Sequence, residues 1–220
     1  MLVRTNQTSR RPNDDHLAAL AGERVSSSEF KYRKGTELFG EGDEPEYVYQ
    51  IIFGAVRTYR LLSDGRRQIN SFHLPGDMFG LENGDAHRFS AEALVETRVR
   101  IMRQRSLLGS MADRAGGTKD LLRLVTQTLQ HAENHMLLLG RKTALERVAA
   151  FLLEMDERQS RPKVMDLPMS RRDIADYLGL TETVSRELSA LRDADLLRFV
   201  GTTQRQLSLP NRDGLARYDA

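Results

Sequence analysis

The feature that most constrains this chain is the stretch from Ser170 to Ala194, which reads SRRDIADYLGLTETVSRELSALRDA. Its apolar residues recur at helical spacing in two groups, which predicts two short helices. Ser170 is a favourable N-cap for the first helix, because its hydroxyl can accept a hydrogen bond from a backbone N–H of the first turn. Gly179 follows that helix, at a position where a left-handed turn would strain any residue with a Cβ atom. The stretch therefore predicts two helices joined by a tight turn.

The second predicted helix is capped by Thr181 and buries Val184, Leu188 and Leu191, at spacings of four and three. Its other face is polar and presents Glu182, Thr183, Ser185 and Arg186 to solvent. A polar first turn on a helix that is propped against another by a glycine turn is typical of a helix-turn-helix reader of the DNA major groove. Arginine can donate twice to guanine, glutamate can accept from cytosine N4, and serine can reach either kind of base edge. Any two amphipathic helices joined by glycine share this pattern, so the flanking segments are needed to decide whether this pair is a helix-turn-helix.

The flanking segments favour a DNA-binding domain. Residues 164–167 predict a short strand before the helix pair, and residues 196–209 predict a hairpin that turns at 201–204. A strand, a helix pair and a hairpin in this order make a winged helix-turn-helix.

The run MSRRDIADYLGLTETVSREL, residues 169–188, resembles the DNA-binding signature of the Crp/Fnr superfamily of transcription regulators. The spacing of its Glu, Ser and Arg is similar to that of the Fnr/FixK branch, which reads TTGAT-type half-sites. This resemblance implies that the bases are contacted by Glu182, Ser185 and Arg186. The residues expected to contact the DNA backbone are Ser170, Arg171, Thr181, Thr183 and Arg205.

The turn of this motif is one residue shorter than is usual in that family, because only five positions separate Gly179 from Val184. One residue on a helix corresponds to about 100° of rotation, so the chain cannot keep both the buried face and the usual turn. Burial of each aliphatic side chain is worth about 1.5–3 kcal/mol, which outweighs an ideal turn. We therefore expect the polar residues to keep their outward face. The second helix should begin a residue late, with Glu182 at or before its first turn.

Residues 1–22 are polar, with one short apolar patch at 17–20, and predict a flexible tail. From Phe30 to about Met102, within an expected domain over 23–118, short apolar runs rich in β-branched and aromatic residues alternate with turn residues at 34–35, 40–43, 63–65 and 75–77. This pattern favours a small antiparallel barrel or jelly roll. The order of the turns resembles the cyclic-nucleotide-binding β-roll of the same superfamily.

The nucleotide-binding members of that superfamily carry a Gly-Glu pair and an Arg-Ser pair, which hold ribose and phosphate. Here Leu81 and Phe89 stand where that Glu and that Arg are needed. The nearest candidates, Glu82 and Arg88, are each displaced by one residue, and such a displacement in a strand turns a side chain to the opposite face. We therefore expect a β-roll without bound nucleotide, and we predict no cofactor.

Residues 119–140 change to a helical period, with a narrow apolar stripe at alternating spacings of four and three. A stripe sustained over nearly three heptads predicts a coiled-coil seam and a two-fold homodimer. The residues expected at this dimer interface are Leu121, Val125, Thr128, Leu129, Ala132, His135, Met136 and Leu139. Gly140 interrupts the pattern and predicts a hinge. The next helix, from Lys142 to about Arg158, should start the DNA-binding domain, which extends over 141–220.

Composition excludes several kinds of site. The chain has no cysteine, which excludes disulfides, thiolate metal sites and cysteine-ligated iron–sulfur clusters. His131 and His135, at i and i+4, could ligate a metal or haem, but no third ligand lies nearby in sequence, so we interpret them as helix-surface residues. The five histidines include no His-x-His pair of the cupin type, which disfavours the alternative of a β-barrel enzyme. We predict neither a metal site nor a catalytic residue.

No run approaches the roughly 20 apolar residues of a membrane span, and the N-terminus lacks the apolar segment of a signal peptide, so we expect a cytoplasmic protein without a membrane partner. The net charge is +2, and residues 170–220 hold eight basic and eight acidic residues, so charge alone would not suggest DNA.

The sequence thus favours an α+β protein with an N-terminal antiparallel β-roll, a long dimerisation helix and a C-terminal winged helix-turn-helix. Its expected partners are double-stranded DNA and a second copy of itself. The resemblance to FixK-type activators implies recruitment of RNA polymerase and control of genes for microaerobic respiration and nitrogen fixation. A regulator gated by cyclic AMP or haem is the alternative.

Overall fold

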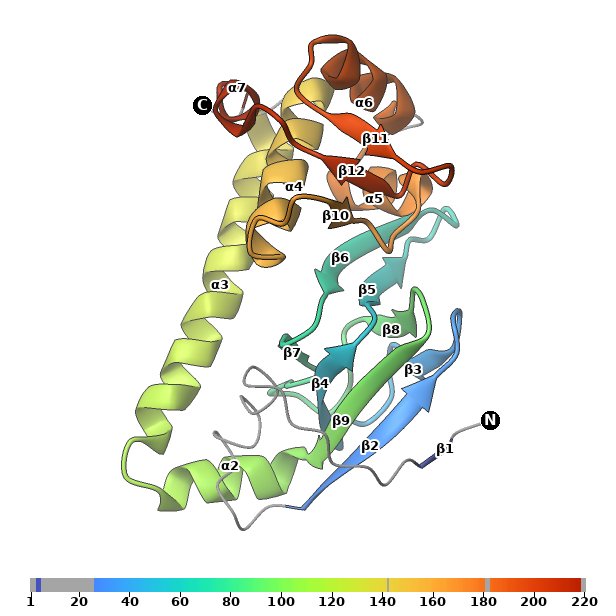
Figure 1. The fold of residues 1–220 in the computed structure, drawn as a ribbon. Helices are drawn as coiled ribbons and strands as arrows, with labels where there is room; N and C mark the ends of the chain where they lie inside the picture. The colour runs from blue at the N-terminus through green and yellow to red at the C-terminus, as the bar shows by residue number, and fades with distance from the viewer. Residues whose placement is uncertain (1–2, 5–25, 142, 181–182, 219–220) are drawn as a thin grey trace. The chain divides into compact units, whose positions relative to one another are not determined.

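The computed structural model describes residues 3–4, 26–141, 143–180 and 183–218 (Figure 1). The chain divides into two compact units, Met1–Leu129 and Gln130–Ala220. Most of the predicted tail, residues 1–22, lies outside the described residues. Its residues Val3–Arg4 form β1, which pairs antiparallel with β2 (Ser27–Tyr32).

The first unit contains two antiparallel sheets. One has the strand order β1-β2-β9-β4-β7 and the other the order β3-β8-β5-β6, so the sheets form separate ladders and do not close into a barrel. The remaining strands are β3 (Glu37–Phe39), β4 (Tyr47–Phe53), β5 (Val56–Leu61), β6 (Arg67–His73), β7 (Met78–Phe79), β8 (Ser90–Ala93) and β9 (Thr97–Arg103). Each of the four turns expected from the sequence contains a glycine with positive φ, at Gly35, Gly42, Gly65 and Gly76. The predicted antiparallel β-roll is confirmed.

Aromatic rings fill the core that the two sheets share. The ring of Phe39 lies 5.3 Å from that of Tyr49 and 6.1 Å from that of Phe79, and the last two rings are 5.2 Å apart. All three side chains are buried, together with Ile51 and Val99. Rings at these separations pack favourably in addition to the apolar area they bury, so they stabilise this core.

Two helices follow the β-roll, α2 (Gln104–Asp113) and α3 (Gly117–Arg141). Leu107 and Met111 of α2 are buried in a second apolar cluster of the first unit, which also contains Leu121 of α3. The expected break at Gly140 is absent, because α3 continues through it to Arg141. A glycine inside a helix costs only about 1 kcal/mol relative to alanine, and burial of the nearby Leu138 can offset that cost.

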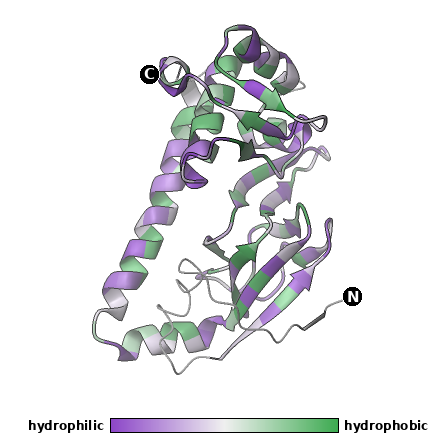
Figure 2. Cartoon of the chain, in the orientation of Figure 1, coloured by the Kyte–Doolittle hydropathy of each residue, from purple (hydrophilic) through white to green (hydrophobic). Residues whose placement is uncertain are grey.

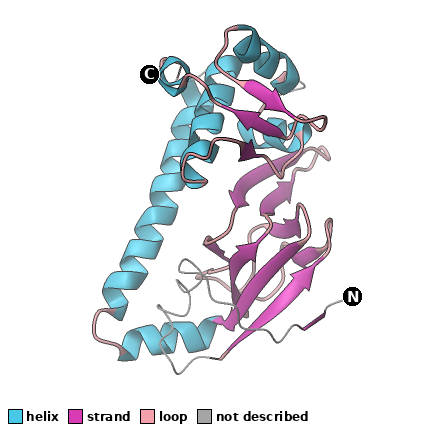
Figure 3. Ribbon diagram, viewed as in Figure 1, coloured by secondary structure: helices cyan, strands magenta, loops and turns pink. Residues whose placement is uncertain are grey.

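The second unit combines helices with a small sheet, as the colours of Figure 3 show. After α3 come α4 (Ala144–Arg158), β10 (Met165–Asp166), α5 (Arg171–Leu178), α6 (Val184–Asp193), β11 (Arg198–Val200), β12 (Gln206–Ser208) and α7 (Arg212–Ala216). The sheet has the order β10-β12-β11. The predicted strand, helix pair and hairpin are therefore all present, and the winged helix-turn-helix is confirmed.

The helix α4 begins later than the sequence predicted. Its N-cap is Thr143, whose side chain accepts from the backbone N–H of Glu146 at 3.4 Å, while the Glu146 carboxylate accepts from the backbone N–H of Thr143 at 2.7 Å. This reciprocal pair is a capping box and fixes the first turn of the helix. The predicted start, Lys142, lies outside the described residues. The inner face of α4 then supplies the core of the unit, including Val148 and Leu152.

Candidate DNA-binding site

The first helix of the pair, α5, is capped as the sequence predicted. Ser170 Oγ accepts from the backbone N–H of Asp173 at 3.1 Å, and Asp173 Oδ2 accepts from the backbone N–H of Ser170 at 2.9 Å. The hydroxyl of Ser170 also donates to Asp173 Oδ2 at 2.7 Å. The side chain expected to contact a DNA phosphate is thus already engaged within the helix cap.

The turn after α5 forms at Gly179, whose φ of 62° is left-handed, as predicted. Its N–H donates to the carbonyl of Ala175 and closes the helix. The two residues that should cap and open the second helix, Thr181 and Glu182, lie outside the described residues. The helix α6 begins only at Val184, which confirms the expected late start.

The two faces of α6 are as predicted. Val184, Leu188 and Leu191 are at most 2% exposed, whereas Ser185 and Arg186 lie exposed in the first turn. The buried core has therefore determined the rotation of the helix, and the two polar residues keep their outward face.

Thr183 departs from the prediction. It was expected on the exposed face as a contact to the DNA backbone, but it is only partly exposed, and its hydroxyl oxygen is buried without a hydrogen-bond partner. Its backbone is helical, with φ −89° and ψ −15°, and its side chain does not cap α6. A residue that caps with its side chain has an extended backbone, so the shortened turn leaves Thr183 unable to play that part.

The hairpin of β11 and β12 forms the wing and turns at residues 201–205. Arg171 of α5 donates through Nη2 to the carbonyl of Gln204 in that turn at 3.0 Å, and its guanidinium lies 5.2 Å from the centre of the Phe199 ring. Burial lowers the pKa of Arg171. The sequence assigned this side chain to a DNA phosphate, but in the structure it holds the wing against α5. Arg205, in the same turn, is partly exposed.

A second group of contacts attaches α5 to the helices before it. His135 of α3 forms a hydrogen bond from Nε2 to the carbonyl of Tyr177 at 2.9 Å, and the two rings stack with centroids 4.1 Å apart. Arg147 of α4 donates to the carbonyl of Leu178 at 2.9 Å and to that of Leu139 at 2.8 Å. These donors satisfy carbonyls at the C-terminal ends of α5 and α3, which lack partners within the helix.

These contacts correct the predicted dimer seam. His135 was placed at the interface, but its ring is covered by Tyr177 of its own chain, and this burial lowers the pKa of His135. Leu121, at the other end of the seam, packs in the apolar cluster with Leu107 and Met111. Thr128 is exposed, and its hydroxyl donates to the carbonyl of Leu124 within the helix. The predicted seam is therefore not exposed over its whole length, and Leu139 is also partly covered.

The exposed apolar stripe of α3 keeps Val125, Leu129, Ala132 and Met136 of the predicted seam, with Leu122 in place of Leu121. Figure 2 shows hydrophobic and hydrophilic residues side by side along this helix. Leu122, Val125, Leu129 and Met136 are 65%, 51%, 56% and 66% exposed, and Ala132 between them is also exposed. Their spacings of three and four give a heptad seam.

In the β-roll segment that would hold a nucleotide, the displaced Arg88 and Glu82 are paired with each other. Arg88 Nε donates to Glu82 Oε2 at 3.1 Å, and the Arg88 guanidinium lies 5.9 Å from the centre of the Phe89 ring. Leu81 packs on the apolar cluster beneath α2. His87 is buried and stacks on Phe39, with ring centroids 3.7 Å apart, and burial lowers its pKa.

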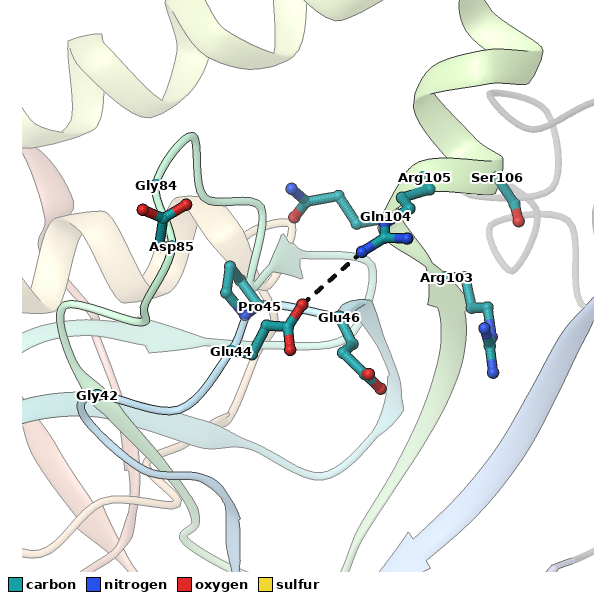
Figure 4. A pocket seen from close by; sticks show the side chains of 10 residues that line it. All are labelled: Gly42, Glu44, Pro45, Glu46, Gly84, Asp85, Arg103, Gln104, Arg105 and Ser106. Atoms are coloured by element: carbon teal, nitrogen blue, oxygen red, sulfur yellow. Dashed lines mark ion pairs between the residues drawn. The ribbon is translucent and has the colours of Figure 1, made fainter.

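A depression of about 670 Å³ lies beside this segment, between the loop at 42–46, the loop at 84–85 and the start of α2 (Figure 4). Carboxylates and guanidinium groups line it together. Glu44 and Arg105 approach to 3.8 Å, and the Arg105 side chain is 95% exposed. Exposed pairs of this kind contribute little to stability, because water screens them. The depression is a solvated, mixed-charge surface.

Two family models match the chain. Residues 146–218 match a Crp-like helix-turn-helix domain, and residues 29–114 match a cyclic nucleotide-binding domain. The nitrogen fixation regulation protein FixK of Rhizobium meliloti (strain 1021) is 47% identical over 186 residues, which are 83% of this chain and 83% of the relative. The chain belongs to the Crp/Fnr family of transcription regulators.

Other members of the family agree with this assignment. The structure of FixK2 from Bradyrhizobium japonicum superposes with a TM-score of 0.85 at 55% identity, over 89% of this chain and 98% of that chain. The transcriptional activatory protein AadR of Rhodopseudomonas palustris (strain ATCC BAA-98 / CGA009) is 39% identical over 191 residues, which are 84% of this chain and 80% of the relative. The chain is a FixK-like regulator with a helix-turn-helix DNA-binding domain.

Two other features are absent from the described residues. In that part of the chain, no group of three or more His, Asp or Glu side chains could hold a metal ion. None of the helices described there has the length and apolar character needed to cross a membrane.

Proposed function

We propose that the protein is a cytoplasmic, homodimeric transcription activator that binds inverted repeats of TTGAT-type half-sites. The main support for DNA binding is the first turn of α6, where Ser185 and Arg186 are exposed on a helix whose opposite face is fully buried. A rigid helix with exposed side chains in its first turn suits insertion into the major groove. Arg186 would donate to a guanine, and Ser185 and Glu182 would contact neighbouring bases.

The exposed stripe of α3 supports the homodimer. An apolar seam left uncovered at heptad spacing is stabilised by pairing with an identical helix about a two-fold axis. Two reading helices related by that axis require half-sites about one turn of DNA apart. In this proposal residues 23–118 form the β-roll domain, 119–140 the dimerisation helix and 141–220 the DNA-binding domain.

The names of two relatives support the proposed physiological role. Two relatives are named as a nitrogen fixation regulation protein and a transcriptional activatory protein. We infer that this chain activates genes for nitrogen fixation or microaerobic respiration and contacts RNA polymerase when bound to DNA. No enzymatic activity and no cofactor form part of the proposal.

The base-reading role is tested with Arg186→Ala. Loss of a bidentate contact to guanine should weaken binding to the specific repeat by about 1–3 kcal/mol per half-site and should relax the preference at one base pair. Binding to random duplex should change much less. Arg192→Ala is a matched control, because Arg192 lies on the same helix and is half exposed, with its guanidinium paired to Asp193. Equal losses on specific and random DNA for Arg186→Ala would contradict the base-reading role.

The dimer is tested with Leu129→Glu, which places a charge in the exposed stripe. We expect monomers in analytical ultracentrifugation and weak binding to the inverted repeat, because each half-site would then be bound alone. Gln130→Glu introduces the same charge about 100° around the helix and should leave the dimer intact. A Leu129→Glu protein that stays dimeric would show that the interface lies elsewhere.

A further inference from the structure

The residue after Arg186 is a buried acid. Glu187 is 8% exposed, and it lies in the first turn of α6 beside a side chain that is 74% exposed. Glu187 Oε1 accepts from Arg186 Nε at 3.1 Å and from Arg186 Nη2 at 2.9 Å. A carboxylate is rarely buried in this way without a partner, and here the partner is the arginine proposed to read a base.

The contact uses one edge of the guanidinium. Arginine carries five N–H donors in a rigid plane, and Glu187 engages the edge formed by Nε and one N–H of Nη2. The remaining edge, formed by Nη1 and the second N–H of Nη2, carries two parallel donors. Two parallel donors match O6 and N7 of guanine. Arg186 can therefore keep its contact with Glu187 while it reads a base.

The contact is not a consequence of helix geometry. Consecutive residues on a helix point about 100° apart, so Arg186 reaches Glu187 only by lying along the helix surface. Glu187 is fixed in turn, because it is buried, and a negative charge is favoured near a helix N-terminus. The direction of the long Arg186 side chain is thus set before any DNA is present.

We propose that Glu187 is a positioning residue for sequence recognition, which orients the guanidinium of Arg186 toward one guanine and thereby sets specificity at that base pair. The inference rests on the proposed base-reading role of Arg186. Ordering a long side chain on binding costs affinity, and an arginine held in place beforehand avoids much of that cost.

The proposal predicts different effects on two kinds of DNA. A carboxylate near the DNA backbone repels phosphates, so its removal should leave binding to random duplex unchanged or slightly tighter. Removal should weaken binding to the specific repeat, because Arg186 would lose its orientation. A purely structural role in α6 would instead weaken both.

The experiment compares the full-length protein with Glu187→Ala and Glu187→Gln on three duplexes at one salt concentration. The duplexes are the inverted repeat, the repeat with the contacted guanine replaced, and a scrambled sequence. Glu187→Ala should weaken binding to the repeat about two- to tenfold per half-site, the range expected for ordering one long side chain. Glu187→Gln should fall between the wild type and Glu187→Ala, because its amide oxygen still accepts from Arg186.

The same Glu187 substitutions, made in an Arg186→Ala background, complete a double-mutant cycle. With no guanidinium to position, Glu187→Ala should leave the ratio of specific to random affinity unchanged. If the ratio falls there as much as in the wild-type background, or if Glu187→Ala weakens both kinds of DNA equally, the positioning role is overturned while base reading by Arg186 stands. If Arg186→Ala itself leaves the ratio unchanged, the proposed function fails instead.

Discussion

The segment 82–90 of the β-roll and the first turn of α6 each carry an exposed arginine that is paired with a carboxylate, but they differ in what surrounds that pair. In the β-roll, Arg88 and Glu82 pair with each other, and Phe89 lies under the arginine. On α6, Arg186 is paired with the buried Glu187 and stands beside the exposed Ser185, on a helix anchored by its opposite face. An arginine fixed by a buried carboxylate on a packed helix is oriented for recognition, whereas Arg88 lies in a loop with an apolar ring beside it.

The largest effect expected from this comparison is on stability. Phe79→Ala removes a ring from the packed interior of the β-roll and should lower the free energy of unfolding by about 3–5 kcal/mol. Ser185→Ala, on the exposed face of α6, should change it by less than about 0.5 kcal/mol and affect DNA binding instead. Chemical denaturation followed by circular dichroism measures both. A loss below about 1 kcal/mol for Phe79→Ala would indicate a loosely packed interior with space for a ligand.

The next largest effect, again on stability, is expected at Arg171, which the sequence assigned to contact with the DNA backbone. Arg171→Ala should destabilise the second unit by about 1.5–3 kcal/mol, the value of a hydrogen bond to a charged group, because the wing turn loses its contact with α5. Binding to specific and random DNA should fall together. The matched control is Arg172→Ala, which changes an exposed neighbour. If Arg171→Ala weakens DNA binding without any loss of stability, the side chain contacts DNA as the sequence predicted.

A smaller, pH-dependent effect is expected at His135. Burial under Tyr177 lowers its pKa below the ordinary value of about 6.5, while the hydrogen bond to the Tyr177 carbonyl and the charge of Glu154 oppose the shift and His131 adds to it. The unfolded chain then binds more protons than the folded chain once the pH falls below about 6.5. The contribution of His135 to stability is therefore complete above that pH and is lost as the pH falls toward the lowered pKa.

The test compares the wild type with His135→Gln, which can still donate a hydrogen bond but does not titrate. The difference in unfolding free energy between the two proteins should shrink as the pH is lowered from about 7.5 to about 5.5. His87 has the same sign of shift, but it is present in both proteins and cancels. A difference independent of pH would show that His135 is not buried in solution as it is here.

Local patterns were read correctly from the sequence. The Ser170 cap, the left-handed Gly179 and the outward face of Ser185 and Arg186 each depend on neighbours within one or two helical turns. The Thr143–Glu146 capping box was missed, although a Thr followed three residues later by Glu is a recognisable signal.

The missed features depend on contacts between distant elements. The sequence gives no sign that Arg171 reaches Gln204 in the wing or that Arg147 reaches Leu178, because these contacts join residues 33 and 31 positions apart in the chain. The N-terminal end of the predicted dimer seam was misplaced for a related reason. Leu121 and Leu122 are equally apolar, and periodicity alone does not tell which of two adjacent apolar faces packs against the same chain.

The smallest effect is expected from cyclic AMP, and it is the sharpest test of the contrast between the two polar segments. A ligand present at a hundred times its dissociation constant should raise the unfolding free energy by about 2.7 kcal/mol. In the β-roll the Arg88 guanidinium is already paired with Glu82, and Phe89 would place an apolar ring against a phosphate. We therefore expect micromolar cyclic AMP to change neither the melting temperature nor the affinity for the inverted repeat.

The same measurement is made on Glu82→Ala, which releases Arg88 from its carboxylate partner. If cyclic AMP raises the melting temperature of the wild type, the paired segment is a binding site. If it does so only for Glu82→Ala, pairing rather than the position of Phe89 is what keeps the nucleotide out.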